Sequence, residues 1–397
     1  MMAVLILGIS QMVSQLSTFG QDVEFLKKNI EVVVLSDAAG QAQVAIAPAY
    51  QGRVMTSTAK GAEGESFGWI NKELIASGKT GPHMNAYGGE ERFWTGPEGG
   101  QFSIYFPKGA AFDFNNWQVP AVIDTEAFDL VSKTNEAAIF RKKTRMTNWS
   151  GTNFELQIDR TIRLLDNNEA SKDLATAIGK EVSMVAYETD SKVTNTGKEA
   201  WKKETGLLSI WILSMLSPSP ETTVVIPFEA GPEEKLGPKV NDDYFGKVPA
   251  ERLIVKDDVL FFRGDGKYRS KIGLSVKRAK PILGSYDATN KVLTIVQYTK
   301  PKDAKEYVNN AWKMQDNPYE GDAVNSYNDG PLEGGAKQMG PFYELETLSP
   351  ALSLEPGQSG THIHRVFHFK GQEDKLDKIA VATLGVKIAE IEKVFKL

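Results

Sequence analysis

Short β-type segments separated by turn residues run through almost the whole chain, and this pattern restricts the fold more than any other feature. Runs rich in valine, isoleucine, threonine and aromatic residues, such as IEVVVLSD (30–37) and FELQIDRTIRLL (154–165), alternate with glycine, proline, asparagine and aspartate. Regularly spaced short strands are typical of all-β sandwiches and barrels. No glycine–serine linker and no internal repeat interrupts them, so we expect one large, mostly antiparallel β-sandwich.

Helical spacing of apolar residues is confined to a few short segments. It occurs in DVEFLKKN (22–29), DAKEYVNNAW (303–312) and KLDKIAVATLGVKIAEIEKVFKL (375–397). These segments predict short helices at the two ends of the chain and one within it, in an otherwise all-β protein.

The first residues form an apolar run from Met1 to Ile9 that is too short to span a bilayer. The run resembles the core of a signal peptide, although the positively charged segment that usually precedes such a core is missing. We therefore expect residues 1–22 to be a signal-peptide remnant or an N-terminal helix, and residues 23–397 to form a single domain. A signal peptide would make the protein secreted or periplasmic; an ordinary helix would leave it cytoplasmic. No transmembrane segment is expected.

Composition narrows the possible functions. The chain has 397 residues, 41% of them hydrophobic, which is enough to bury a large core. Its net charge is −5 and no run of basic residues is present, so nucleic acid is not expected as a partner. Because the sequence has no cysteine, thiolate nucleophiles and cysteine-ligated metals are excluded. Catalysis would have to come from carboxylates, histidine, tyrosine or lysine, without a cofactor.

Two stretches, Gly81–Phe106 and Asn309–Glu346, combine glycine, asparagine, aromatic and acidic residues. Aromatic rings stack on the apolar faces of sugars, and amides and carboxylates bind sugar hydroxyls, so this composition indicates a sugar site. Ordinary turn-rich loops share the composition. The candidate ligand-binding residues in these two stretches are His83, Asn85, Tyr87, Arg92, Trp94, Glu98 and Asn328.

Near the C-terminus, the strand-like sequence FYELETL places two carboxylates at alternate positions. Successive side chains of a strand point to opposite faces, so Glu344 and Glu346 share a face with Phe342, while Tyr343 and Leu345 share the other. The two acids converge on one patch, which is either part of a site or a solvent-facing side of the strand.

Four segments, in this order, resemble the galactose mutarotase-like superfamily, which includes the aldose 1-epimerases and uncharacterised bacterial relatives. They are QGRVMTST (51–58), GGEERFWTGPEGG (88–100), VTNTGKEAW (193–201) and LETLSPALSLEPGQSGTHIHRVFHF (345–369). The resemblance implies a β-supersandwich with few short helices and a sugar-binding cleft on the concave face of one sheet. It also implies that the last segment forms a closing hairpin.

The same resemblance implies roles for individual residues. Glu346 matches the glutamate that acts as general base toward the anomeric hydroxyl of the sugar, and Glu344 would raise its pKa further. The histidine that serves as general acid in the epimerases is missing from the matching segment GLLSIWILSMLSPSP (206–220). His83 could take the acid role. Two functions stay open: an epimerase-like enzyme acting on a mono- or oligosaccharide, and a non-catalytic glycan-binding protein.

Three histidines near the C-terminus raise the alternative of a metal site. His362 and His364, which share a strand face with His368, could chelate a metal together with Glu344 or Glu346, but nothing in their spacing requires it and we expect no metal.

Charged and aromatic residues add candidates for the same site. Arg92 and Lys271 are candidate partners of a ligand carboxylate or of Glu98, with a structural ion pair as the alternative. Trp94 and Trp211 are candidate stacking residues, with burial in the core as the alternative. We expect the stretch from His83 to Glu98 to lie opposite Glu346.

Overall fold

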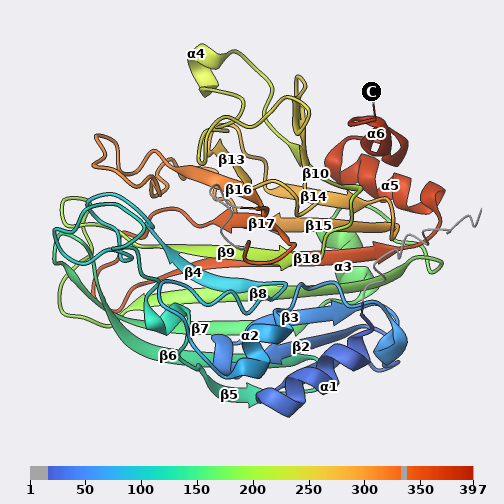
Figure 1. Ribbon diagram of the computed structural model, residues 1–397, viewed down its shortest axis with the longest axis horizontal. Coiled ribbons are helices and arrows are strands. Elements are labelled where there is room, and N and C mark those ends of the chain that lie inside the picture. Colours follow the sequence, from blue (N-terminus) through green and yellow to red (C-terminus); the bar gives the residue numbers. More distant parts are fainter. Residues whose placement is uncertain (1–16, 332–337, 397) are drawn as a thin grey trace, which may run out of the picture.

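A computed structural model describes residues 17–331 and 338–396 of the chain. Its strands form three sheets in which neighbouring strands are antiparallel, with the orders β1-β2-β3, β11-β12-β10-β14-β15-β18-β8-β7-β6-β5 and β13-β16-β17-β9-β4 (Figure 1). The strands are β1 Val33–Ser36, β2 Gln43–Ala47, β3 Arg53–Thr58, β4 Arg92–Gly96, β5 Asp129–Lys133, β6 Ala137–Thr147, β7 Asn153–Leu164, β8 Ser183–Asn195, β9 Ser209–Leu216, β10 Thr222–Pro227, β11 Leu253–Val255, β12 Val259–Arg263, β13 Ser270–Ser275, β14 Ile282–Asp287, β15 Val292–Tyr298, β16 Asp322–Asn328, β17 Tyr343–Leu348 and β18 Ser359–Lys370.

The main core lies between the ten-stranded and the five-stranded sheet. It brings Phe140 and Ile158 of the larger sheet together with Ile212 and Leu345 of the smaller one, all fully buried. Apolar residues from both inner faces interdigitate in this way in a β-sandwich. The predicted fold class, a mostly antiparallel β-sandwich with few short helices, is confirmed.

Helices α5 and α6 cover one end of the ten-stranded sheet on the side away from the main core. The helices of the described chain are α1 Phe19–Asn29, α2 Lys72–Ser77, α3 Asn167–Asp173, α4 Glu233–Leu236, α5 Glu373–Leu384 and α6 Ile388–Lys393. Leu376 and Ile388, from α5 and α6, pack on Leu293 and Phe367 of the sheet, and Figure 1 shows both helices beside β10, β14 and β15. Among the described residues, no helix is both long and apolar enough to cross a membrane.

The terminal helices follow the sequence pattern. Helix α1 begins with a capping box, in which Thr18 Oγ1 accepts from the Gln21 N–H and the Gln21 side chain accepts from the Thr18 N–H. The proposed boundary after residue 22 lies inside this helix, whereas residues 1–16 of the expected leader lie outside the described residues. The C-terminal helical segment is divided into α5 and α6 at Gly385, which adopts a left-handed φ of 76°.

Two predictions were wrong. Residues 303–312 form no helix; instead the adjacent residues Tyr307 and Val308 are both buried in irregular backbone, which bridges to Glu320. Apolar residues next to each other in sequence do not form one helical face. The expected closing hairpin is also absent, because β17 pairs with β16 and β9 in the smaller sheet while β18 pairs with β15 and β8 in the larger one.

Candidate functional site

The two neighbouring glutamates of β17 lie on the outer face of the five-stranded sheet, away from the larger sheet. Tyr343 shares a hydrogen bond of 2.8 Å with Ser285 of β14, and Thr347 contacts histidines of β18, so these odd-numbered residues face the larger sheet. Glu344 and Glu346 must therefore point the other way. The predicted common face of the two acids agrees with these contacts.

Strand register assembles the rest of this outer face. Across β9, Arg92 of β4 and Glu346 of β17 both pair with Leu213, and on its other side Glu346 pairs with Asn325 of β16. Residues that pair directly across strands project from the same face. The outer face, a name we keep for this set, comprises Lys271, Asn325, Tyr327, Glu344, Glu346, Trp211, Leu213, Met215, Arg92 and Trp94.

Glu346 is fully buried and is held by two donors. Its Oε2 accepts a hydrogen bond of 3.0 Å from Trp211 Nε1 and one of 2.9 Å from Lys271 Nζ. Lys271 Nζ also lies 4.9 Å from the centre of the Trp211 ring. Nearby carboxylates raise the pKa of Lys271 despite its burial, so the lysine stays positively charged. Glu346 therefore lies beneath its neighbours on this face, with no exposed surface of its own.

Glu344 forms a second buried ion pair beside the first. Arg92 donates to Glu344 Oε1 at 2.9 Å, and the Arg92 guanidinium carbon lies 4.3 Å from the centre of the Trp94 ring. Burial raises the pKa of Glu344, and the charge of Glu346 raises it further, although Arg92 acts in the opposite direction. The sequence led us to expect such an increase at Glu346, with Glu344 as the neighbouring acid; the raised pKa is that of Glu344.

Glu98 lies two residues after the end of β4 and completes a group of three acids around Lys271. Burial raises its pKa to about 7, Lys271 opposes this shift, and the charge of Glu346 adds to it. The indoles of Trp117 and Trp312 face Glu98 and stack on each other with ring centres 5.6 Å apart. The expected link between Glu98 and Lys271 is thus an electrostatic interaction.

The first loop places His83 near this region, but in a different environment. His83 Nδ1 lies 2.6 Å from the backbone oxygen of Trp117, and the ring packs on exposed Phe114 with centres 4.4 Å apart. The contact with a carbonyl oxygen assigns the proton to Nδ1 and leaves Nε2 as the acceptor. Within the described residues, no hydrogen bond or ion pair joins His83 to Glu346, Lys271 or Glu98.

Three other predicted site residues make structural contacts away from Glu346. Asn85 donates to Asp124 at 2.8 Å and accepts from the Gly81 N–H at 2.8 Å. Tyr87 stacks on Tyr50 at 4.0 Å in a separate apolar cluster near α1 and α2. The Asn328 side chain bonds the Gly266 N–H, Asp265 and the Tyr268 carbonyl. We leave these three residues out of the candidate site.

The metal alternative is wrong in the form suggested by the sequence. Thr347 Oγ1 lies 2.8 Å from His362 Nε2 and 2.9 Å from His364 Nδ1, in the interior between the sheets. Glu344 and Glu346 point to the opposite side of their strand, so they cannot join these histidines around one ion. Burial lowers the pKa of His362 to about 3 and that of His364 well below its usual value, which keeps both neutral.

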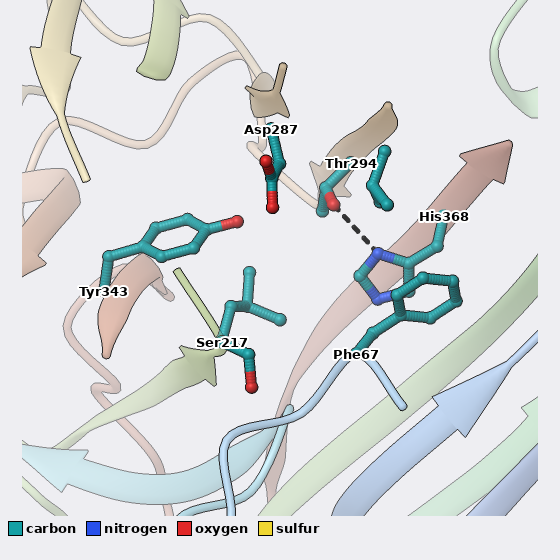
Figure 2. Close-up of a pocket in the computed structure, with 8 residues that line it drawn as sticks. Phe67, Ser217, Asp287, Thr294, Tyr343 and His368 are labelled. Atoms are coloured by element: carbon teal, nitrogen blue, oxygen red, sulfur yellow. Dashed lines mark hydrogen bonds between the residues drawn. The ribbon is translucent and has the colours of Figure 1, made fainter. Parts of the chain in front are cut away.

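A small cavity lies on this interior side rather than at the outer face (Figure 2). It is lined by Phe67, Leu216, Ser217, Asp287, Val292, Thr294, Tyr343 and His368. His368 bonds Thr294 through Nδ1 at 2.9 Å and Glu90 through Nε2 at 2.8 Å, so both ring nitrogens have protein partners. These contacts identify His368 as a structural residue between the layers.

The sequence did not single out several polar neighbours of the site. Asn325 donates to the Tyr244 hydroxyl at 2.9 Å, that hydroxyl bonds Asp322, and Lys271 Nζ lies 5.6 Å from the Tyr244 ring centre. Asn325 could have been found from the alternation in DAVNSYN, which places it on one face with Tyr327. Tyr244 lies in an irregular loop whose local sequence holds no signal of this contact.

Comparison with known proteins places these features in context. A family model described as "Family of unknown function (DUF6786)" matches residues 17–395. No curated protein matches the sequence.

Among solved structures, the Slr1438 protein from Synechocystis sp. PCC 6803 superimposes with a TM-score of 0.51 at 11% sequence identity, covering 85% of this chain and 96% of that one. This likeness shows a shared fold. A galactose mutarotase-like protein from Lactobacillus casei ATCC 334 gives a TM-score of 0.49 at 11% identity, over 85% of this chain and 100% of that one. A galactose mutarotase related enzyme from Lactobacillus acidophilus gives 0.45 at 11% identity, over 86% of this chain and 98% of that one.

Proposed function

The chain belongs to DUF6786, a family of unknown function, and we propose that it binds a mono- or oligosaccharide at the outer face of its five-stranded sheet. We further propose that it acts on this sugar by acid–base chemistry, with Glu346 as the general base.

The observation that carries the proposal is a set of buried polar atoms without protein partners. They are Glu346 Oε1, Trp94 Nε1 and Arg92 Nε. Buried polar groups are normally paired, so each such atom needs an explanation. The three lie in one contiguous cluster, because Arg92 stacks on Trp94, and Trp94 packs edge-to-face, at 5.6 Å, on the Trp211 ring that bonds Glu346.

A sugar satisfies all three atoms at once. A hydroxyl group both donates and accepts, so one hydroxyl can donate to Glu346 Oε1 while neighbouring hydroxyl oxygens accept from Trp94 Nε1 and Arg92 Nε. The surrounding indole rings suit the apolar faces of a pyranose. A ligand with several adjacent hydroxyls fits this mixture of donors, one acceptor and aromatic surface.

The contacts of Glu346 also suit a general base. Lys271 and Trp211 both bind Oε2, which fixes the carboxylate and leaves Oε1 to accept a proton. A general base must lie within hydrogen-bond reach of the proton that it removes. The sequence resemblance to the epimerases assigns the same role to this residue, with the anomeric hydroxyl as the proton donor.

A specific observation favours the second candidate, a non-catalytic glycan-binding protein. Strand β9 presents Trp211, Leu213 and Met215 to the outer face, and no histidine. In the epimerases that the sequence resembles, this region supplies the general acid. A protein that had kept the sugar contacts and lost the general acid would carry a β9 strand of this kind, with no histidine on the outer face.

The test compares Glu346→Gln with wild type and with a control, Glu188→Gln. Glu188 is also a mostly buried, ion-paired carboxylate, but it lies on β8 of the other sheet, where Arg163 and Arg365 bind it. Calorimetry with a panel of mono- and oligosaccharides measures binding. Polarimetry of freshly dissolved α-D-glucose and α-D-galactose measures turnover.

For an enzyme, we expect Glu346→Gln to lower the rate by about 10² to 10⁴. For a binding protein, we expect it to weaken affinity by about 1.5–3 kcal/mol, the contribution of a hydrogen bond to a charged group. Glu188→Gln should change neither quantity. A folded Glu346→Gln protein with unchanged affinity and rate would refute the proposal.

A further inference from the structure

Next to the outer face lies a carboxyl group, that of Glu98, to which the resemblance to the epimerases assigns no role. Glu98 lies two residues after the end of β4, and its backbone is fixed on both sides. Its N–H donates to Asn310 Oδ1 at 2.8 Å, and its carbonyl oxygen accepts from Ser103 Oγ at 2.5 Å. These two hydrogen bonds fix the backbone from which the Glu98 side chain extends. A residue that transfers protons needs such a fixed position relative to its substrate.

Charged and aromatic groups from four parts of the chain surround the Glu98 carboxyl. Lys271 comes from β13, Glu346 from β17, Tyr105 and Trp117 from the segment after β4, and Trp312 from the loop before β16. Among the charged groups, Lys271 favours the ionised form and Glu346 opposes it, while burial is the largest influence. Burial and the charge of Glu346 thus act against Lys271 at this carboxyl, and the side chain keeps part of its surface exposed, through which it can exchange a proton with solvent.

Glu98 and Glu346 thus meet around a common cation. Lys271 binds Glu346 directly at 2.9 Å and interacts with Glu98 through its charge. Two carboxyl groups whose environments differ in this way can take opposite roles, one as acid and one as base. His83 has no comparable link to Lys271, since its Nδ1 is bound by the Trp117 carbonyl and its ring packs on Phe114.

We propose that Glu98 is the general acid that works together with Glu346 on a pyranose bound at the outer face. This proposal rests on the proposed function. It supplies the proton donor that strand β9 lacks.

The proton transfers balance without any other reactant. Glu346 removes the proton of the anomeric hydroxyl, the C1–O1 bond becomes a carbonyl, and the bond between C1 and the ring oxygen breaks. Glu98 gives its proton to that ring oxygen, which yields the open-chain aldehyde. After rotation about C1–C2, the C5 hydroxyl attacks the other face of the carbonyl, returning its proton to Glu98, while O1 recovers a proton from Glu346.

The test measures mutarotation between pH 5 and 9 for wild type, Glu98→Gln, His83→Asn and an exposed control, Glu355→Gln, each with sugar affinity measured by calorimetry. We expect Glu98→Gln to lower kcat by about 10² to 10⁴ with KM changed less than about threefold. The wild-type rate should fall as the pH rises through about 7, because Glu98 loses its proton there, and this decline should be absent from the residual activity of Glu98→Gln.

A readout independent of turnover is the infrared band of a protonated carboxyl. It should be present near neutral pH in wild type, disappear as the pH rises, and be lost in Glu98→Gln. A Glu98→Gln protein with the wild-type rate and pH profile would overturn the assignment, and loss of activity in His83→Asn would then identify His83 as the acid.

The two proposals fail in distinguishable ways. If wild type binds sugar but does not interconvert anomers, the acid assignment is overturned while sugar binding stands. If wild type binds no sugar, the proposed function itself is overturned.

Discussion

Lys271 on β13 reaches past the intervening strand β16 to donate a hydrogen bond of 2.9 Å to Glu346 on β17. Strand pairing places Lys271 opposite Tyr327, and Tyr327 opposite Glu344. Lys271 therefore bonds Glu346, which lies two residues along β17 from Glu344, the residue in line with the lysine across the sheet. Its ammonium group therefore lies near both carboxylates of β17 and near Glu98. One cation thus holds together the three acids of the candidate site.

The first prediction concerns this pair. Lys271→Met should lower the free energy of unfolding by about 3–5 kcal/mol, because it leaves the fully buried Glu346 without its counter-charge. The double variant Lys271→Met with Glu346→Met should recover much of the loss, since both charges are then gone. Urea unfolding at neutral pH measures both effects.

A matched control is Lys28→Met, which removes a lysine from an exposed pair with Glu24 and should leave stability almost unchanged. Equal stability of Lys271→Met and wild type would show that the Lys271–Glu346 contact contributes nothing to the fold.

The second prediction separates two tryptophans of the outer face. Trp211 Nε1 donates to Glu346, whereas Trp94 Nε1 has no protein partner. Trp211→Phe should therefore cost about 1.5–3 kcal/mol more stability than Trp94→Phe, because both remove similar volume but only the first removes a hydrogen bond to a charged group. Trp94→Phe should instead weaken sugar binding. Thermal unfolding and calorimetry distinguish the two; equal stability losses would contradict the assignment of these N–H groups.

The third prediction concerns the segment GGEER. Its three charged residues bind three different strands: Glu90 pairs with His368 of β18 at 2.8 Å, Glu91 with Arg160 of β7, and Arg92 with Glu344 of β17 at 2.9 Å. Glu91 and Arg160 are both completely buried. Glu91→Gln should lower the free energy of unfolding by about 3–5 kcal/mol, because Arg160 is left as an unpaired buried charge.

The control for this change is Glu306→Gln, which breaks an exposed pair with Lys203 and should alter the free energy of unfolding by less than about 1 kcal/mol. Chemical denaturation gives both values. An equally small loss in the free energy of unfolding for both variants would show that the Glu91–Arg160 pair does not hold the segment in place.

The fourth prediction follows from the raised pKa of Glu98. Folded Glu98, with a pKa of about 7, keeps a proton that the unfolded chain, with the ordinary value of 4.5, releases. Its contribution to stability is complete below pH 4.5 and is lost as the pH rises through about 7, at no more than about 1.4 kcal/mol per pH unit. The stability of wild type minus that of Glu98→Gln should therefore fall between these pH values. A flat difference would mean that Glu98 has an ordinary pKa in the folded protein.

The sequence by itself determined the local structure of this protein. Alternation of β-branched and turn residues predicted the antiparallel sandwich, and the period of two residues placed Glu344 and Glu346 on one face. The terminal helices were predicted because the apolar spacing that indicates a helix lies within a single element. Such signals depend only on residues a few positions apart.

Only the tertiary structure decided the partners of those residues. Arg92 binds Glu344 from 252 positions away, and Lys271 reaches Glu346 because the sheet has the order β13-β16-β17-β9-β4. The same order separates β17 from β18, and it directs Thr347 toward His362 while Glu346 faces away from it. Sheet order and layer are set by which surfaces can be buried together over the whole chain, so no local pattern around Arg92, Lys271 or Glu98 could specify that their charged groups converge.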